Sequence, residues 1–61
     1  MLVPEMNTFC RCYDLIYVES GRVEHQDVYW FIDFKNNKRY YTVSEIQDKL
    51  REIGCGTFFH L

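Results

Sequence analysis

The segment Val28–Leu50 limits what this 61-residue chain can fold into more than any other part does. Its aromatic and β-branched residues predict one strand that ends at Phe34 and another over Lys38–Val43. Between them, Asn36 and Asn37 tolerate the positive φ angles of a two-residue hairpin loop. The segment therefore predicts a β-hairpin that leads directly into a helix.

The helix has a start signal and a stop signal. Thr42 and Glu45 have the spacing of a capping box, in which each residue satisfies a backbone N–H near the other, and Ser44 with Gln47 is a second choice. Gly54 stands where a glycine that ends a helix belongs. A helix of about ten residues fits between these signals. Its apolar stripe would be Ile46, Leu50 and Ile53.

Before the segment that begins at Val28, the sequence predicts an N-terminal arm, one further strand and a turn. Residues 1–7 contain Pro4 and show little periodicity, so we expect a loose N-terminal arm. The run Thr8–Val18 is dense in aromatic and β-branched residues and predicts a strand. Glu19–Arg22 reads as a turn, after which a second strand would run over Val23–Phe34.

Together these signals predict a single α+β domain over residues 8–61. Its order would be β-β-β-α-β: a three-stranded antiparallel meander, one helix on one face, and a short C-terminal strand or extension over Cys55–Leu61. The composition, 48% hydrophobic and 18% aromatic, argues against disorder. A domain of this size buries only about 60% of its unfolded surface, which leaves little room for a catalytic cleft. We therefore expect no enzymatic activity and no small-molecule substrate.

One helix covers one face of a sheet, so the two faces must differ. With two-residue turns, strand alternation assigns these residues to the helix-covered face: Phe9, Tyr13, Leu15, Tyr17, Val28, Trp30, Ile32, Phe34, Tyr41 and Val43. The helix-free face would carry Cys10, Cys12, Asp14, Ile16, Val18, Val23, His25, Tyr29, Phe31, Asp33, Tyr40 and Thr42. Trp30 is thus expected in the core and Phe31 on the surface.

Large apolar side chains on the helix-free face predict a binding surface. Leaving them in water forgoes several kcal/mol at ~25 cal/mol per Å². The expected anchors are Ile16, Val18, Tyr29, Phe31 and Tyr40. We expect a homodimer or another protein partner there, and the role of an inhibitor, adaptor or other accessory protein, a class in which phage proteins are frequent. The alternative is that the C-terminal tail folds over this face.

Nucleic-acid binding is a second alternative. Aromatic residues on an open sheet can stack on bases and a basic turn can contact phosphates, which gives the set Tyr29, Phe31, Lys35, Lys38 and Arg39. In topology alone, a three-stranded sheet with one helix is similar to the sheet that some integrase arm-binding domains place in a DNA groove. The net charge of −2 and the expected positions of Asp14 and Asp33 argue against this function.

The cysteines allow a third alternative, a small zinc-stabilised module. Cys10, Cys12, Cys55 and His60 offer three thiols and an imidazole, which tetrahedral zinc accepts, although a Cys-x-Cys spacing is unusual for such a site. The odd number of cysteines favours free, reduced thiols, and we expect a cytoplasmic protein without a cofactor. The sequence has no apolar run long enough to span a membrane.

Overall fold

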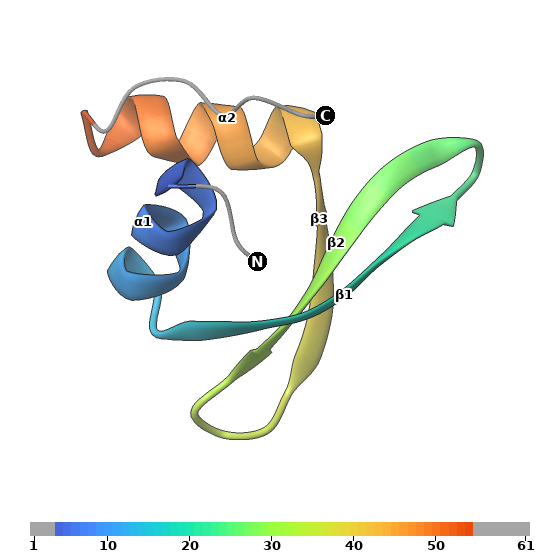
Figure 1. Ribbon diagram of the computed structural model, residues 1–61, viewed down its shortest axis with the longest axis horizontal. Coiled ribbons are helices and arrows are strands. Elements are labelled where there is room, and N and C mark those ends of the chain that lie inside the picture. Colours follow the sequence, from blue (N-terminus) through green and yellow to red (C-terminus); the bar gives the residue numbers. More distant parts are fainter. Residues whose placement is uncertain (1–3, 55–61) are drawn as a thin grey trace.

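The computed structural model describes residues 4–54 and confirms an α+β fold (Figure 1). Three antiparallel strands form one open sheet in the meander order β1-β2-β3, and a helix packs on it, as the sequence predicts. A second helix precedes the strands. The elements are α1 (Pro4–Cys12), β1 (Leu15–Val23), β2 (Gln26–Asp33), β3 (Lys38–Thr42) and α2 (Val43–Glu52). The strand or extension predicted over Cys55–Leu61 lies outside the described residues.

The helix α1 replaces the loose arm and the first half of the strand that the sequence predicts, so both predictions are wrong over residues 4–12. Met6, Phe9 and Cys10 are all buried in the core. Their spacing of three and four residues places them on one face of a helix, where they pack together against the sheet. The gain from burying this stripe outweighs the strand propensity of the aromatic and β-branched residues in Thr8–Val18.

A short turn connects α1 to the sheet. The N–H groups of Tyr13 and Asp14 donate to the carbonyl oxygens of Phe9 and Arg11, at 3.2 and 3.5 Å. Asp14 has a φ of 51°, in the left-handed region that commonly ends a helix and that aspartate tolerates. After this reversal, β1 begins at Leu15.

The loop between β1 and β2 lies further along the chain than predicted. The sequence predicts a turn at Glu19–Arg22, but these residues belong to β1, and Val23 pairs with Gln26. The two-residue loop is Glu24–His25, and both residues have positive φ angles, 51° and 68°. This pattern is that of a type I′ turn, which matches the twist of the flanking strands.

Replacing the two residues of this loop by the pair asparagine–glycine should stabilise the protein. The left-handed conformation costs an ordinary residue roughly 1–2 kcal/mol, and Asn-Gly is the pair best suited to a type I′ turn. We expect the double substitution Glu24→Asn with His25→Gly to raise the free energy of unfolding by about 1 kcal/mol. Urea denaturation followed by circular dichroism would measure this gain, and an unchanged or lower midpoint would contradict the assigned turn.

A β-bulge divides β1 into two parts. Tyr17 pairs with Phe31 and Glu19 pairs with Trp30, so Val18 is an extra residue without a cross-strand partner. An extra residue changes the side-chain alternation along the strand and bends it. As a result, the alternation of side chains between the two faces of the sheet shifts by one residue at Val18. Counting alternate residues along the whole of β1 therefore assigns one part of the strand to the wrong face.

The β2–β3 loop contains three residues, not the predicted pair Asn36–Asn37. It runs from Phe34 to Asn36, with the Asp33 and Asn37 backbones paired across its base at 3.1 Å. Asn36 has a φ of 65°, so the predicted positive φ is confirmed at this residue. The Asp33 carboxylate accepts hydrogen bonds from the N–H groups of Asn37 and Lys35 at 2.8 and 2.9 Å, which holds the pKa of Asp33 below its usual value.

The longer loop shifts the register and reverses the predicted faces of β2. Phe31 is completely buried and contacts Phe9 and Tyr41, with ring centroids 5.2 and 5.7 Å apart. Its prediction as a surface residue is therefore wrong. Trp30, predicted in the core, lies on the opposite face of the sheet from Phe31 because neighbouring strand residues alternate.

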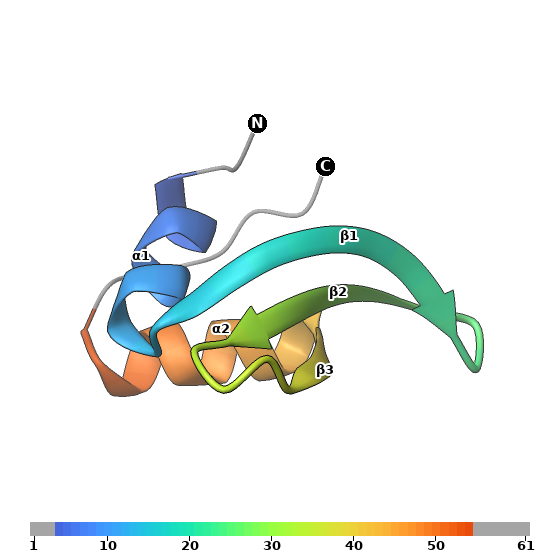
Figure 2. The ribbon, with the colours of Figure 1, turned by 90° about the horizontal axis from the view of Figure 1, so that it is seen from below.

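The core lies between the helices and the face of the sheet that carries Phe31. Ile46 and Leu50 of α2 meet Met6 and Phe9 of α1 in this cluster, and all four are almost completely buried. The tip of the β1–β2 hairpin points away from both helices in both ribbon views (Figures 1 and 2). The helices thus leave the other face of the sheet without a covering helix among residues 4–54.

Candidate functional site

Two rows of paired residues cross the sheet on the face opposite Phe31. One row is Ile16, Ile32 and Lys38, and the next is Glu19, Trp30 and Tyr40. Val18, which follows the inward-facing Tyr17, lies on the same side as these rows. We call this surface the open face and define it as Ile16, Val18, Glu19, Trp30, Ile32, Lys38 and Tyr40. A third row, at the start of α2, contains the buried Val28.

Three apolar side chains of the open face are exposed to solvent. Ile16 has 67% of its surface exposed, Val18 41% and Tyr40 40%. The sequence predicts all three on a helix-free face, and the structure places them there. Ile16 and Val18 lie on β1 and Tyr40 on β3, on either side of Trp30 and Ile32 of β2.

Trp30 lies at the centre of the open face. Its ring meets the ring of Tyr40 at a centroid distance of 4.9 Å and an angle of 60°. Gly21 leaves room on the other side, since a β-carbon there would lie 3.4 Å from the indole Nε1. The half-buried indole thus occupies a space that the side chains of the neighbouring strands leave for it.

An ion pair crosses the open face above β2. Lys38 Nζ on β3 lies 2.8 Å from Glu19 Oε1 on β1, and the same nitrogen lies 5.1 Å from the centroid of the Trp30 ring. Both charged side chains are about half exposed, 45% for Lys38 and 54% for Glu19. Exposed pairs of this kind contribute roughly 0.2–1 kcal/mol, so the contact is easily exchanged for another one.

Two of the five predicted anchors lie elsewhere. Phe31 is buried in the core, and Tyr29 packs partly buried against it. Both assignments depended on the predicted registers, which the structure corrects. Trp30 and Ile32 lie on the open face instead. The sequence signal for this register is Asp33, whose carboxylate accepts from the N–H of Asn37 across a three-residue loop that ends in Asn36.

The residues predicted for nucleic-acid binding do not share one surface. Lys38 belongs to the open face, whereas Arg39 lies on the face of its cross-strand partner Phe31. Arg39 bonds to Tyr41, and this contact raises the pKa of the guanidinium. Lys35 lies in the loop, with its nitrogen 5.7 Å from the ring of the exposed Phe34.

Two of the predicted thiol ligands, Cys10 and Cys12, lie on α1 and point in different directions. Cys10 is buried and Cys12 is exposed, because residues two apart on a helix point in different directions. Burial raises the pKa of the Cys10 thiol. Cys55 and His60 lie outside the described residues. Within residues 4–54, no three histidine, cysteine, aspartate or glutamate side chains form a metal-binding group.

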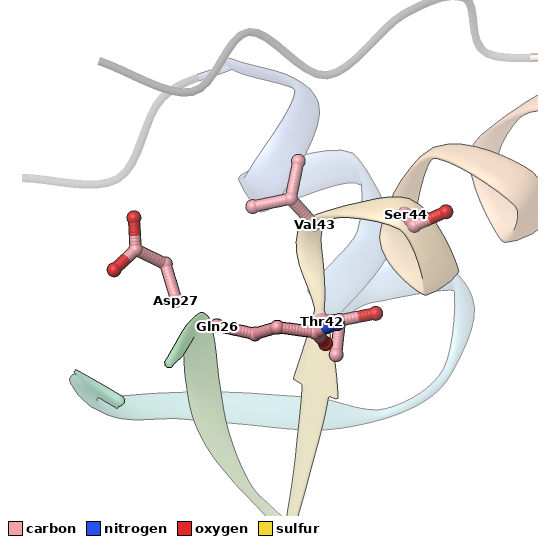
Figure 3. Close-up of a pocket in the computed structure, with 5 residues that line it drawn as sticks. All are labelled: Gln26, Asp27, Thr42, Val43 and Ser44. Atoms are coloured by element: carbon pink, nitrogen blue, oxygen red, sulfur yellow. The ribbon is translucent and has the colours of Figure 1, made fainter. Parts of the chain in front are cut away.

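A pocket of about 290 Å³ lies beside the start of α2 (Figure 3). Its lining residues are Gln26, Asp27, Thr42, Val43 and Ser44. Thr42 is already engaged in the predicted capping box, which the structure confirms: its hydroxyl accepts from the Glu45 N–H at 3.2 Å, and the Glu45 carboxylate accepts from the Thr42 N–H at 3.0 Å. Asp27 pairs with Arg22 at 3.3 Å. In the described part of the chain no buried side-chain polar atom lacks a partner.

The fold and the surface define a small α+β protein with one aromatic sheet face open to solvent. No protein-family model, curated protein or solved structure matches the chain. Over residues 4–54, neither helix has the length and apolar character required to cross a membrane.

Proposed function

We propose that the protein works by binding another protein through its open face, and that the leading partner is a second copy of itself. The observation that carries this proposal is the strip of exposed Ile16, Val18 and Tyr40 around the Trp30 ring. Contiguous apolar patches of this kind mark interaction sites, and tryptophan and tyrosine are enriched among the residues that dominate binding energy.

Burial of this face would stabilise a contact through the hydrophobic effect. Fully burying an aliphatic or aromatic side chain of this size contributes roughly 1.5–3 kcal/mol. Completing the burial of three such side chains therefore contributes several kcal/mol, to set against the loss of motion on association. Trp30, already held between Tyr40 and Gly21, adds area with little further loss of side-chain freedom.

Charge favours protein over nucleic acid as the partner. The chain carries a net charge of −2, and Lys38, the predicted phosphate contact on this face, is neutralised by Glu19. The proposed role is that of a non-enzymatic regulatory or accessory protein, such as an inhibitor or adaptor. Reduced cysteines in odd number suit a cytoplasmic location.

Sedimentation of the reduced protein over a concentration series tests the proposal. We expect the wild-type chain to dimerise in the micromolar range and the variant Ile16→Asp to remain monomeric, because it would bury an unpaired carboxylate in the interface. Ile53→Asp, at the end of α2 and away from the open face, is the matched control and should dimerise normally. A wild-type monomer at high micromolar concentration, or a dimeric Ile16→Asp, would contradict self-association through this face.

A further inference from the structure

The open face already holds one cation, the ammonium group of its own Lys38. The Nζ atom lies 2.8 Å from Glu19 Oε1 and 5.1 Å from the centroid of the Trp30 ring. A carboxylate beside an aromatic ring attracts a cation in two ways, through the ion pair and through the negative face of the ring. Glu19 and Trp30 are paired across β1 and β2, so the backbone register keeps the two groups together.

The tryptophan ring of this cation site is held between its neighbours. Tyr40, paired with Trp30 across β2 and β3, meets the indole at an angle of 60°. On the β1 side the indole lies close to the backbone of Gly21, where a β-carbon would be 3.4 Å from Nε1. The ring therefore loses little freedom when a cation binds, which favours binding.

Lys38 occupies this site only loosely. Its side chain is 45% exposed and that of Glu19 is 54% exposed, so water competes with the ion pair. A lysine side chain also regains rotational freedom when it is released. The presence of Lys38 should therefore weaken the binding of a second cation by no more than roughly tenfold.

We propose that the site formed by Glu19, Trp30 and Tyr40 binds an arginine side chain of the protein partner. Lys38 holds the site in the free chain and leaves it when the arginine enters. A guanidinium group can donate two parallel hydrogen bonds to one carboxylate while its plane lies against an aromatic ring, whereas an ammonium group acts as a point charge. This inference rests on the proposed protein binding through the open face, and it adds the chemistry by which the partner is recognised.

Titration with the amide of N-acetylarginine, followed by tryptophan emission, tests the site directly. Trp30 is the single tryptophan of the chain, so a change in emission reports a cation at its ring. At constant ionic strength, and at a protein concentration below that of dimerisation, Lys38→Ala should bind the probe at least about fivefold more tightly than wild type. The uncharged citrulline analogue should leave the emission unchanged, and the lysine analogue should bind more weakly than the arginine probe.

Two further variants separate the site from general charge effects. Adding Glu19→Gln to Lys38→Ala keeps the shape but removes the carboxylate, and it should weaken probe binding by about tenfold relative to Lys38→Ala alone. Lys35→Ala makes the same charge change in the β2–β3 loop, beside the Phe34 ring, and should bind the probe as wild type does.

The outcomes distinguish this inference from the proposed function. A folded Lys38→Ala protein whose emission does not respond to the arginine probe, or responds equally to the lysine analogue, would overturn the arginine site. A wild-type chain that still dimerises would then leave the proposed function standing. Conversely, a Lys38→Ala variant that binds the probe, together with a wild-type chain that stays monomeric, would count against a second copy as the partner and support the arginine site.

Discussion

The variant Phe31→Ala is expected to lose about 3–5 kcal/mol of folding free energy, the usual cost of emptying a buried aromatic site. Phe31 is completely buried, and its ring meets those of Phe9, Tyr17 and Tyr41 at centroid distances of 5.2 to 5.8 Å. A domain of this size has little stability beyond that amount. We therefore expect the variant to be largely unfolded at room temperature, as measured by far-ultraviolet circular dichroism.

The neighbouring substitution is the matched comparison. Trp30→Ala removes a larger ring from the open face, where one side is available to solvent, and we expect a loss of less than about 2 kcal/mol in the monomer. Urea denaturation of both variants at low protein concentration would rank them. A Trp30 variant less stable than the Phe31 variant would mean that the face assignments on β2 are reversed.

Removing residues 1–7 is expected to have the second large effect. The deletion takes away the buried Met6 side chain, and the loss of a methionine from a core typically costs about 2–5 kcal/mol. It also leaves a helix of about five residues, which is too short to persist without strong packing. The remaining Phe9 would lose its helical support beside Phe31 and Tyr41.

Thermal unfolding of the shortened protein measures this contribution. Met6→Leu, a change that keeps the volume, is the control and should cost less than about 1.5 kcal/mol. An unchanged melting temperature after the deletion would support the loose arm that the sequence alone predicts, and would contradict the packing of α1.

The second half of the fold could be predicted because its signals are local. The capping box of Thr42 and Glu45 and the glycine after the helix each act within a few residues, and the structure confirms both, with a φ of 78° at Gly54. The apolar spacing of Ile46 and Leu50 likewise gives the buried side of α2 correctly, whereas Ile53, the third residue of the predicted stripe, is exposed.

The faces of the sheet could not be predicted in the same way, because side-chain alternation carries any error in loop length along a whole strand. The β2–β3 loop is one residue longer than predicted and begins two residues earlier, at Phe34, which moves Phe31 from the predicted surface to the core. The bulge at Val18 changes the phase again in β1. Ile16, Val18 and Tyr40 were placed correctly, whereas Tyr29 and Phe31 were not.

The first helix was missed for a different reason. Strand propensity measures how well a residue fits a half-buried pleated surface, and the residues of Thr8–Val18 fit one well. The helical spacing of Met6, Phe9 and Cys10 was the competing signal, and only the assembled core shows that a second helix is needed beside α2. Tertiary packing decided between two locally acceptable structures.

The position of Trp30 also gives the protein a built-in optical reporter. It is the single tryptophan of the chain, and the aromatic residues of the core cluster are phenylalanines and tyrosines. Indole emission therefore senses the polarity and the lysine charge at the open face, whereas the backbone signal of circular dichroism senses the fold. When the two signals change at different protein or salt concentrations, contact at the face and unfolding of the domain can be followed separately in one unlabelled sample.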